Sequence, residues 1–204
     1  MKYSTRELTL VGILSATNGV IEIGMGTLLH IVKMPLAGTF MLLFNLTLYF
    51  LARKMIPRTG VIVIVGLITA ILKLMYAGAD KLMPAVAIFS EAVIVEIISA
   101  LIRQGRMSAL FSGAAANSFT LIFPFLSYML FGGARSLAVI ESLITRIQLS
   151  LHCQAPFVIS LLLLFYIFTG LIIGLAAWNM ASLTYEYTLA VGRKALSPAA
   201  ADKK

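Results

Sequence analysis

Six apolar runs, each about twenty residues long, divide this 204-residue chain almost from end to end. A helix of about 20 apolar residues is long enough to span the ~30 Å hydrocarbon core of a bilayer. Prolines, glycines and basic residues, which commonly end helices, lie between the runs. The pattern predicts an all-α membrane protein: a single domain built as a six-transmembrane-helix bundle. The predicted spans cover residues 8–29, 35–52, 60–77, 82–102, 108–131 and 157–181.

Composition agrees with this interpretation, since 60% of the residues are hydrophobic and only 12% are charged. The mean hydropathy of +0.99 is higher than is typical of a water-soluble domain. The single cysteine, Cys153, cannot form an internal disulfide, and no cluster of potential ligands predicts a metal site.

The basic residues are distributed unevenly between the two sides of the predicted bundle. Of the 16 lysines and arginines, eleven fall on the side of the two termini, four on the other side and one, Lys73, inside a span. The positive-inside rule therefore predicts that both termini are cytoplasmic. The net charge of +8 follows from these loops, so we expect no nucleic-acid partner. The predicted location is the inner or plasma membrane of a prokaryote, with the lipid bilayer as the surrounding medium.

The longest connection, residues 135–156, falls on the outer side. Its apolar residues recur at steps of three and four, which predicts an amphipathic helix that lies at the membrane interface or caps the bundle. The segment after Gly192 has no apolar period, so residues 193–204 are predicted to be a mobile tail.

Charged and amide side chains inside the spans are the candidate functional residues. A charged side chain at the bilayer centre costs at least ~2.5–3.5 kcal/mol, so it normally faces a protein interior or a wet cavity. Glu91 and Asn117 fall near the midplane, and Glu22 and Lys73 lie further out at a matched depth. Together they predict a ligand pocket that opens outward. Glu96, on the inner side of its span, is included as a further candidate.

Structural roles compete with these assignments. Asparagines in membrane helices, including Asn18 and Asn45, often form only interhelical hydrogen bonds. Glu22 and Lys73 could form a structural ion pair, and Glu96 could bond a neighbouring helix. The sequence leaves both alternatives open.

Small residues at four-residue spacing form a second pattern. Gly12 and Ala16 follow it in the first span, as does Gly19 four residues after Ser15, and Gly170 and Gly174 follow it in the last. This spacing lets helices approach closely, either within the chain or against a partner.

A compact six-span chain with this spacing in its first span and an outward polar pocket resembles the substrate-binding S component of energy-coupling factor (ECF) vitamin transporters. The resemblance covers the layout of the whole chain and implies capture of a vitamin or vitamin precursor from outside. It implies a membrane T component and two ATPase subunits as partners, which would use ATP, so that this chain needs no cofactor. By the same resemblance, Gly12, Ala16 and Gly19 would dock the T component, and residues 135–156 would gate the pocket.

If Glu22, Glu91 and Lys73 all face the pocket, its net charge is negative. This favours a cationic or amine-bearing ligand, such as a thiamine-related compound.

Other classes of protein remain as alternatives. A structural scaffold that recruits partner helices would explain the small-residue spacing but not the buried charges. A membrane-embedded enzyme is less favoured, because the chain has no G-x-S-x-G, H-E-x-x-H or P-loop motif. We therefore expect no catalytic residues.

Overall fold

A computed structural model describes residues 3–34, 36–77, 82–131 and 155–196, and this part of the chain is entirely α-helical apart from its connections. Most of the predicted outer segment 135–156, and the tail from residue 197, lie outside the described residues. The helices are α1 (Thr5–Ile31), α2 (Ala37–Met55), α3 (Val61–Ala77), α4 (Leu82–Leu101), α5 (Arg106–Phe131) and α7 (Ala155–Leu196). Each contains most or all of one predicted apolar run.

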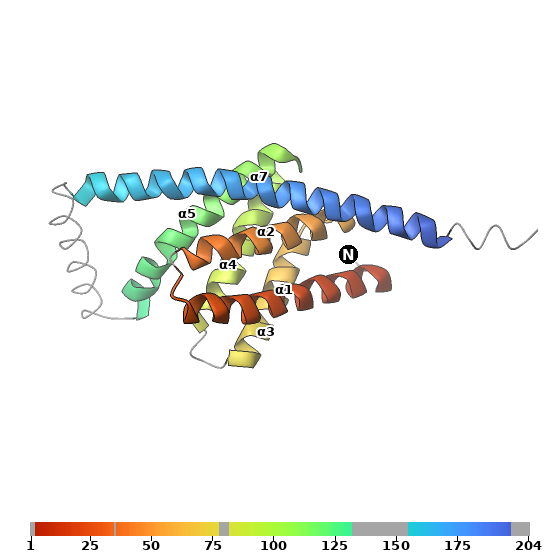
Figure 1. Cartoon of the computed structure of the whole chain (residues 1–204), viewed down its shortest axis with the longest axis horizontal. Helices are drawn as coiled ribbons and strands as arrows, with labels where there is room; N and C mark the ends of the chain where they lie inside the picture. Colours follow the sequence, from red (N-terminus) through yellow and green to blue (C-terminus); the bar gives the residue numbers. More distant parts are fainter. Residues whose placement is uncertain (1–2, 35, 78–81, 132–154, 197–204) are drawn as a thin grey trace, which may run out of the picture.

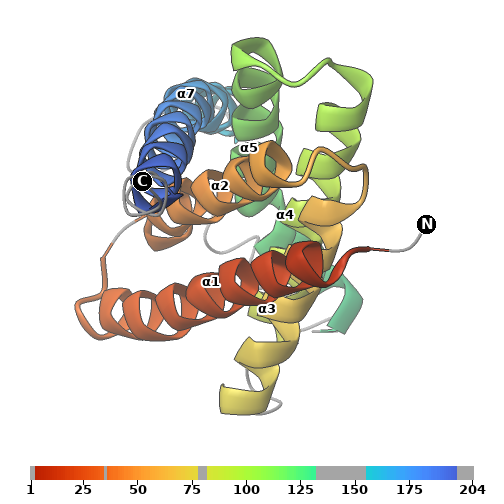
Figure 2. The ribbon, with the colours of Figure 1, turned by 90° about the vertical axis from the view of Figure 1, so that its right-hand side faces the viewer.

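Helix α2 lies at the centre of the described bundle and contacts each of the other five helices. The outer helices follow one another around it in the order α1, α3, α4, α5 and α7 (Figures 1 and 2). The fully buried side chains of α2 include Leu42, Leu46 and Tyr49, which form the middle of the apolar core. The helix richest in buried carboxylates, α4, packs at the side of α2, against α3 and α5.

Local sequence signals explain where several helices begin. Ser4 and Glu7 form a reciprocal cap at the start of α1: the Ser4 N–H donates to Glu7 (2.7 Å) and the Glu7 N–H to the Ser4 hydroxyl (3.3 Å). Gly60, with φ of +90°, provides the turn into α3. Pro84 sits in the first turn of α4, where its missing N–H removes no helical hydrogen bond.

Small residues bring α5 and α7 almost into backbone contact. A Cβ atom on Gly174 would lie 2.1 Å from the Ala109 carbonyl oxygen, and one on Gly113 would lie 2.2 Å from that of Gly170. A Cβ on Gly66 of α3 would likewise lie 2.2 Å from the Cβ of Ala92 in α4. Of the two interpretations left open by the sequence, packing within the chain therefore holds for the Gly170–Gly174 pair.

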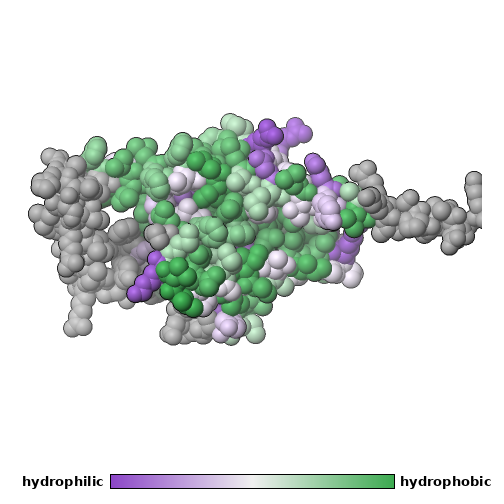
Figure 3. Space-filling model, viewed as in Figure 1, coloured by the Kyte–Doolittle hydropathy of each residue, from purple (hydrophilic) through white to green (hydrophobic). Residues whose placement is uncertain are grey.

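Along the long axis of the molecule, polar residues lie toward the ends and apolar residues cover the middle (Figure 3). Figure 3 shows hydrophobic residues over most of the visible face and hydrophilic residues gathered toward both ends of the bundle. Such a broad exposed apolar surface is expected where lipid replaces water. Three of the described helices are long and apolar enough to cross a membrane, within Thr5–Leu29, Leu82–Leu101 and Ile159–Gly192, and α3 is apolar but shorter. The structure is thus that of a helical protein suited to a membrane, while six crossings and cytoplasmic termini remain predictions.

Helix α7 is much longer than the predicted span 157–181. Its 42 residues extend for about 63 Å, roughly twice the thickness of a hydrocarbon core. The helix continues to Leu196, so the first four residues of the predicted mobile tail are helical. Its far end and the start of α1 lie toward the same end of the molecule (Figure 1).

Candidate ligand-binding site

The distal end of the bundle, where α1 ends and α2 begins, contains a cavity of about 1160 Å³. Side chains from all six described helices line this distal cavity. Its volume slightly exceeds the usual range of about 300–1,000 Å³ for small-molecule sites, which are mostly apolar with a few convergent polar groups. The polar lining residues of the distal cavity are Glu22, Thr27, Asn45, Lys73, Tyr76, Glu91, Thr120, Ser127 and Tyr166.

An ion pair between α1 and α3 forms one side of the cavity. The Lys73 ammonium lies 2.5 Å from Glu22 Oε2, and Asn45 of α2 donates its amide to Glu22 Oε1 over 2.8 Å. Glu22 is 4% exposed, and both of its carboxylate oxygens are engaged. The pair predicted as one alternative therefore exists, and its members line the cavity as well.

Glu91 of α4 also lines the cavity and has only neutral described partners. Thr120 of α5 donates its hydroxyl to Glu91 Oε1 (3.1 Å), and Asn45 lies close enough to interact with the Glu91 carboxyl group as well. Glu91 is 6% exposed and lies close enough to Glu22 for their like charges to interact. A carboxylate this buried, whose described partners are neutral, is poorly compensated.

The formal charges of the cavity do not cancel. Lys73 balances Glu22, and the described lining offers no second cation for Glu91. Apolar side chains, among them Met41, Met83 and Phe123, form much of the remaining wall. The cavity therefore combines an apolar wall with an acidic floor.

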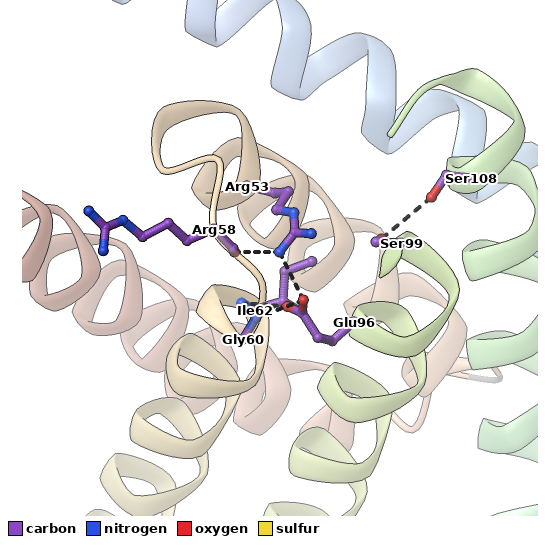
Figure 4. A network of polar contacts seen from close by, with 7 residues as sticks. All are labelled: Arg53, Arg58, Gly60, Ile62, Glu96, Ser99 and Ser108. Carbon is purple, nitrogen blue, oxygen red and sulfur yellow. Dashed lines mark hydrogen bonds and ion pairs between the residues drawn. The ribbon is translucent and has the colours of Figure 1, made fainter. Parts of the chain in front are cut away.

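The structure places Glu96 elsewhere, at the opposite end of α4. Its Oε1 lies 2.8 Å from Arg53 Nη1 of α2 and accepts the Gly60 N–H at 2.8 Å, while Oε2 accepts the Ile62 N–H at 3.1 Å (Figure 4). Arg53 also donates to the Arg58 carbonyl oxygen. Glu96 thus caps the start of α3 and neutralises a buried arginine, and it does not line the distal cavity. The described contacts favour the structural alternative for this residue over the ligand-binding one.

Asn117 is also outside the cavity lining. It is fully buried, and its amide donates to the Tyr166 carbonyl oxygen (2.8 Å) and the Thr169 hydroxyl (2.9 Å), joining α5 to α7. Thus Glu22, Lys73 and Glu91 meet at one cavity, whereas Asn117 and Glu96 contact neighbouring helices instead.

The three candidate docking residues of α1 do not share one environment. Gly12 and Ala16 are exposed, and nothing lies within 4 Å of a Cβ built on Gly12. Gly19 is buried, and a Cβ there would lie 3.0 Å from Leu72 of α3. Gly12 and Ala16 are therefore free for a partner in the described structure, whereas Gly19 packs within the chain.

Sequence reasoning missed Thr120 and treated Asn45 mainly as a packing residue. Thr120 lies one helical turn after Asn117. Its position in the sequence does not reveal that its side chain, on α5, contacts Glu91 of α4. Asn45 has a clearer signal, since it is an amide side chain near the middle of the predicted span 35–52. Both contribute to the cavity because α2 and α5 pack side by side around its floor.

Comparison of the chain with known protein families, curated proteins and solved structures finds no match.

Proposed function

We propose that this chain is the substrate-binding S component of an ECF-type importer, and that the distal cavity captures a vitamin-like small molecule. The observation that carries the proposal is the convergence of three membrane-depth charges, Glu22, Lys73 and Glu91, on one cavity at the end away from the N-terminus. Charged side chains are costly at that depth, and a ligand site is a common reason for their presence. With a cytoplasmic N-terminus, the cavity opens to the outside.

The proposal assigns no catalytic role and no cofactor to this chain. A T component and two ATPase subunits would supply the energy, and ATP would be hydrolysed by them. Gly12 and Ala16 are exposed and small, so a partner helix could approach α1 closely at these positions. The chain would reside in the cell membrane of a prokaryote.

Two measurements test the proposal together. The tagged chain, extracted gently from its native membranes, should co-purify with a membrane subunit and a pair of ABC ATPases, and native mass spectrometry should detect a bound small molecule. Uptake of that molecule by cells should require this chain and should stop when the ATPase glutamates are replaced. Uptake that continues without functional ATPases would contradict the ECF assignment.

A scaffold that recruits partner helices is the second candidate. The observation that favours it is α7, whose 42 residues exceed one membrane crossing and whose far part exposes Leu183 and Tyr187. A scaffold would bind its partners with an empty cavity and would tolerate Glu91→Gln without any loss of function. An S component would not.

A further inference from the structure

The Glu91 carboxyl group, on the floor of the distal cavity, can accept more hydrogen bonds than its described neighbours donate. Glu91 Oε1 receives the Thr120 hydroxyl, whereas Oε2 accepts no hydrogen bond from the described residues. Asn45 Oδ1 also has no described partner, but it is almost completely shielded, so Glu91 is the acceptor that a ligand in the cavity can reach. Asn45 lies close enough to interact with Glu91 as well as with Glu22.

Four of the hydroxyl and amide groups that line the cavity make described hydrogen bonds within the protein, whereas none is described for the hydroxyls of Tyr76 and Tyr166. Asn45 donates to Glu22, and Thr120 donates to Glu91 and to the Ala116 carbonyl oxygen. Thr27 and Ser127 donate to backbone carbonyls of their own helices. The two donors next to Glu91, Thr120 and Asn45, are therefore already engaged within the protein, and the remaining acceptor capacity lies on the Glu91 carboxyl group.

Charge leads to the same requirement. Lys73 is held 2.5 Å from Glu22, so the described lining leaves Glu91 without a counter-ion. A buried carboxylate is stabilised most by a partner that carries both positive charge and N–H groups, since charge-assisted hydrogen bonds are about twice as strong as neutral ones. A quaternary ammonium would supply the charge but leave the acceptors unpaired, at a desolvation cost.

We propose that the distal cavity selects ligands by a cationic group with at least two N–H donors, a primary ammonium or an amidinium-like group, which binds Glu91. The rest of the ligand is apolar or aromatic and packs against Met41, Met83 and Phe123, which line the cavity around this floor. This inference rests on the proposed function for its biological meaning, but the recognition itself is a property of the isolated chain.

Four small probes of one ring size separate charge from hydrogen bonding. Benzamidine carries both positive charge and N–H donors; benzyltrimethylammonium carries only the charge; benzamide carries only neutral donors; benzoate carries the opposite charge. Their affinities for the purified full-length chain would be measured by calorimetry and by the ligand-dependent rise in melting temperature. We expect benzamidine to bind at least about tenfold more tightly than each of the other three.

Two variants assign the effect to Glu91. Glu91→Gln should weaken benzamidine at least about tenfold and leave benzamide almost unchanged, because it removes the charge and keeps the shape. Glu7→Gln makes the same chemical change outside the cavity, at the start of α1, and should leave every affinity unchanged.

Several results would overturn the inference. These are equal binding of benzamidine and benzyltrimethylammonium, tighter binding of benzoate, no benzamidine binding in the millimolar range, or an unchanged affinity in Glu91→Gln. The probe series needs only the natural chain, so it decides the question even if a variant does not fold.

Failure of the ECF assignment is distinguishable: the probes would then bind as expected while uptake proved independent of ATPase subunits. Conversely, ATPase-dependent uptake of an anion that did not change in Glu91→Gln would support the ECF assignment and contradict the inferred ligand selectivity.

Discussion

Replacement of Glu96 by glutamine tests whether this buried carboxylate holds the bundle together or serves a ligand. In the structure it accepts three hydrogen bonds, from Arg53, Gly60 and Ile62, which belong to α2 and to the beginning of α3. The side chains of Glu96 and Arg53 are each only 10% exposed. Glutamine keeps one oxygen acceptor, but it places an NH₂ donor where Oε2 now accepts the Ile62 N–H. It also leaves the Arg53 charge without a counter-ion.

The expected loss of stability follows from these contacts. Removing one partner of a buried ion pair costs about 3–5 kcal/mol, because the remaining charge stays buried. For a chain of about 200 residues, each kcal/mol lowers the melting temperature by about 2–4 °C. Glu96→Gln should therefore lower the melting temperature of the purified protein by about 6–20 °C, measured by a thermal unfolding assay in detergent.

Two further variants show whether the ion pair is the cause. Arg53→Met combined with Glu96→Gln removes the unpaired charge while the glutamine oxygen still accepts the Gly60 N–H, so the double variant should recover more than half of the loss. Glu7→Gln breaks the more exposed ion pair with Arg58, at 2.9 Å, and should cost clearly less than Glu96→Gln.

The affinity for benzamidine separates the structural role from a ligand-binding one. Glu96 lies outside the distal cavity, so the folded Glu96→Gln protein should bind the probe as the natural chain does. A melting temperature within about 2 °C of the natural value would refute the structural reasoning, since it is far below the expected shift. If affinity fell while stability stayed the same, the ligand-binding prediction for Glu96 would hold instead.

Three further changes test packing, docking and the cavity ion pair. Gly174→Ala should destabilise the fold, because its Cβ would lie 2.1 Å from a backbone oxygen, whereas Gly12→Ala should not; thermal melts of the two compare them directly. Ala16→Leu should keep benzamidine affinity but abolish co-purification with the ATPase subunits, and loss of probe binding would show instead that this position packs within the chain. Lys73→Met should lower the melting temperature by removing the partner of Glu22, and it should raise benzamidine affinity, because the cavity becomes more negative; calorimetry that showed weaker binding would contradict this electrostatic account.

The apolar runs of the sequence were sufficient to locate the helices along the chain, but not to predict which helices pack against one another. All six predicted runs correspond to helices, because an uninterrupted apolar stretch bounded by Gly60, Pro84 or basic residues has few other ways to satisfy its backbone. The length of α7 was underestimated, because its polar continuation from Ser182 to Leu196 carries no apolar run, although it is helical. The central place of α2 was not predicted either, since burial within a bundle depends on which helices surround a segment.

The candidate site could be predicted in part, for a similar reason. Depth along each span correctly brought Glu22 and Lys73 to the same level, because a helix rises by a fixed 1.5 Å per residue. The direction of a side chain around its helix is not fixed by depth alone. Asn117 was therefore grouped with Glu91 at mid-depth, although it points toward α7 and bonds Thr169.

Hydrogen-bond satisfaction, more than burial, distinguishes the two buried carboxylates of α4. Glu91 and Glu96 are similarly buried, at 6% and 8% exposure, and lie five residues apart on one helix. Glu96 has a guanidinium and two backbone N–H groups, which together compensate its charge, and substitution there should report on folding. Glu91 has neutral described partners, the Thr120 hydroxyl and the nearby Asn45 amide, and it borders a cavity whose described lining holds no counter-ion for it. A buried carboxylate with too few partners weakens the fold unless something binds it, and this imbalance is the physical reason to seek a ligand at Glu91.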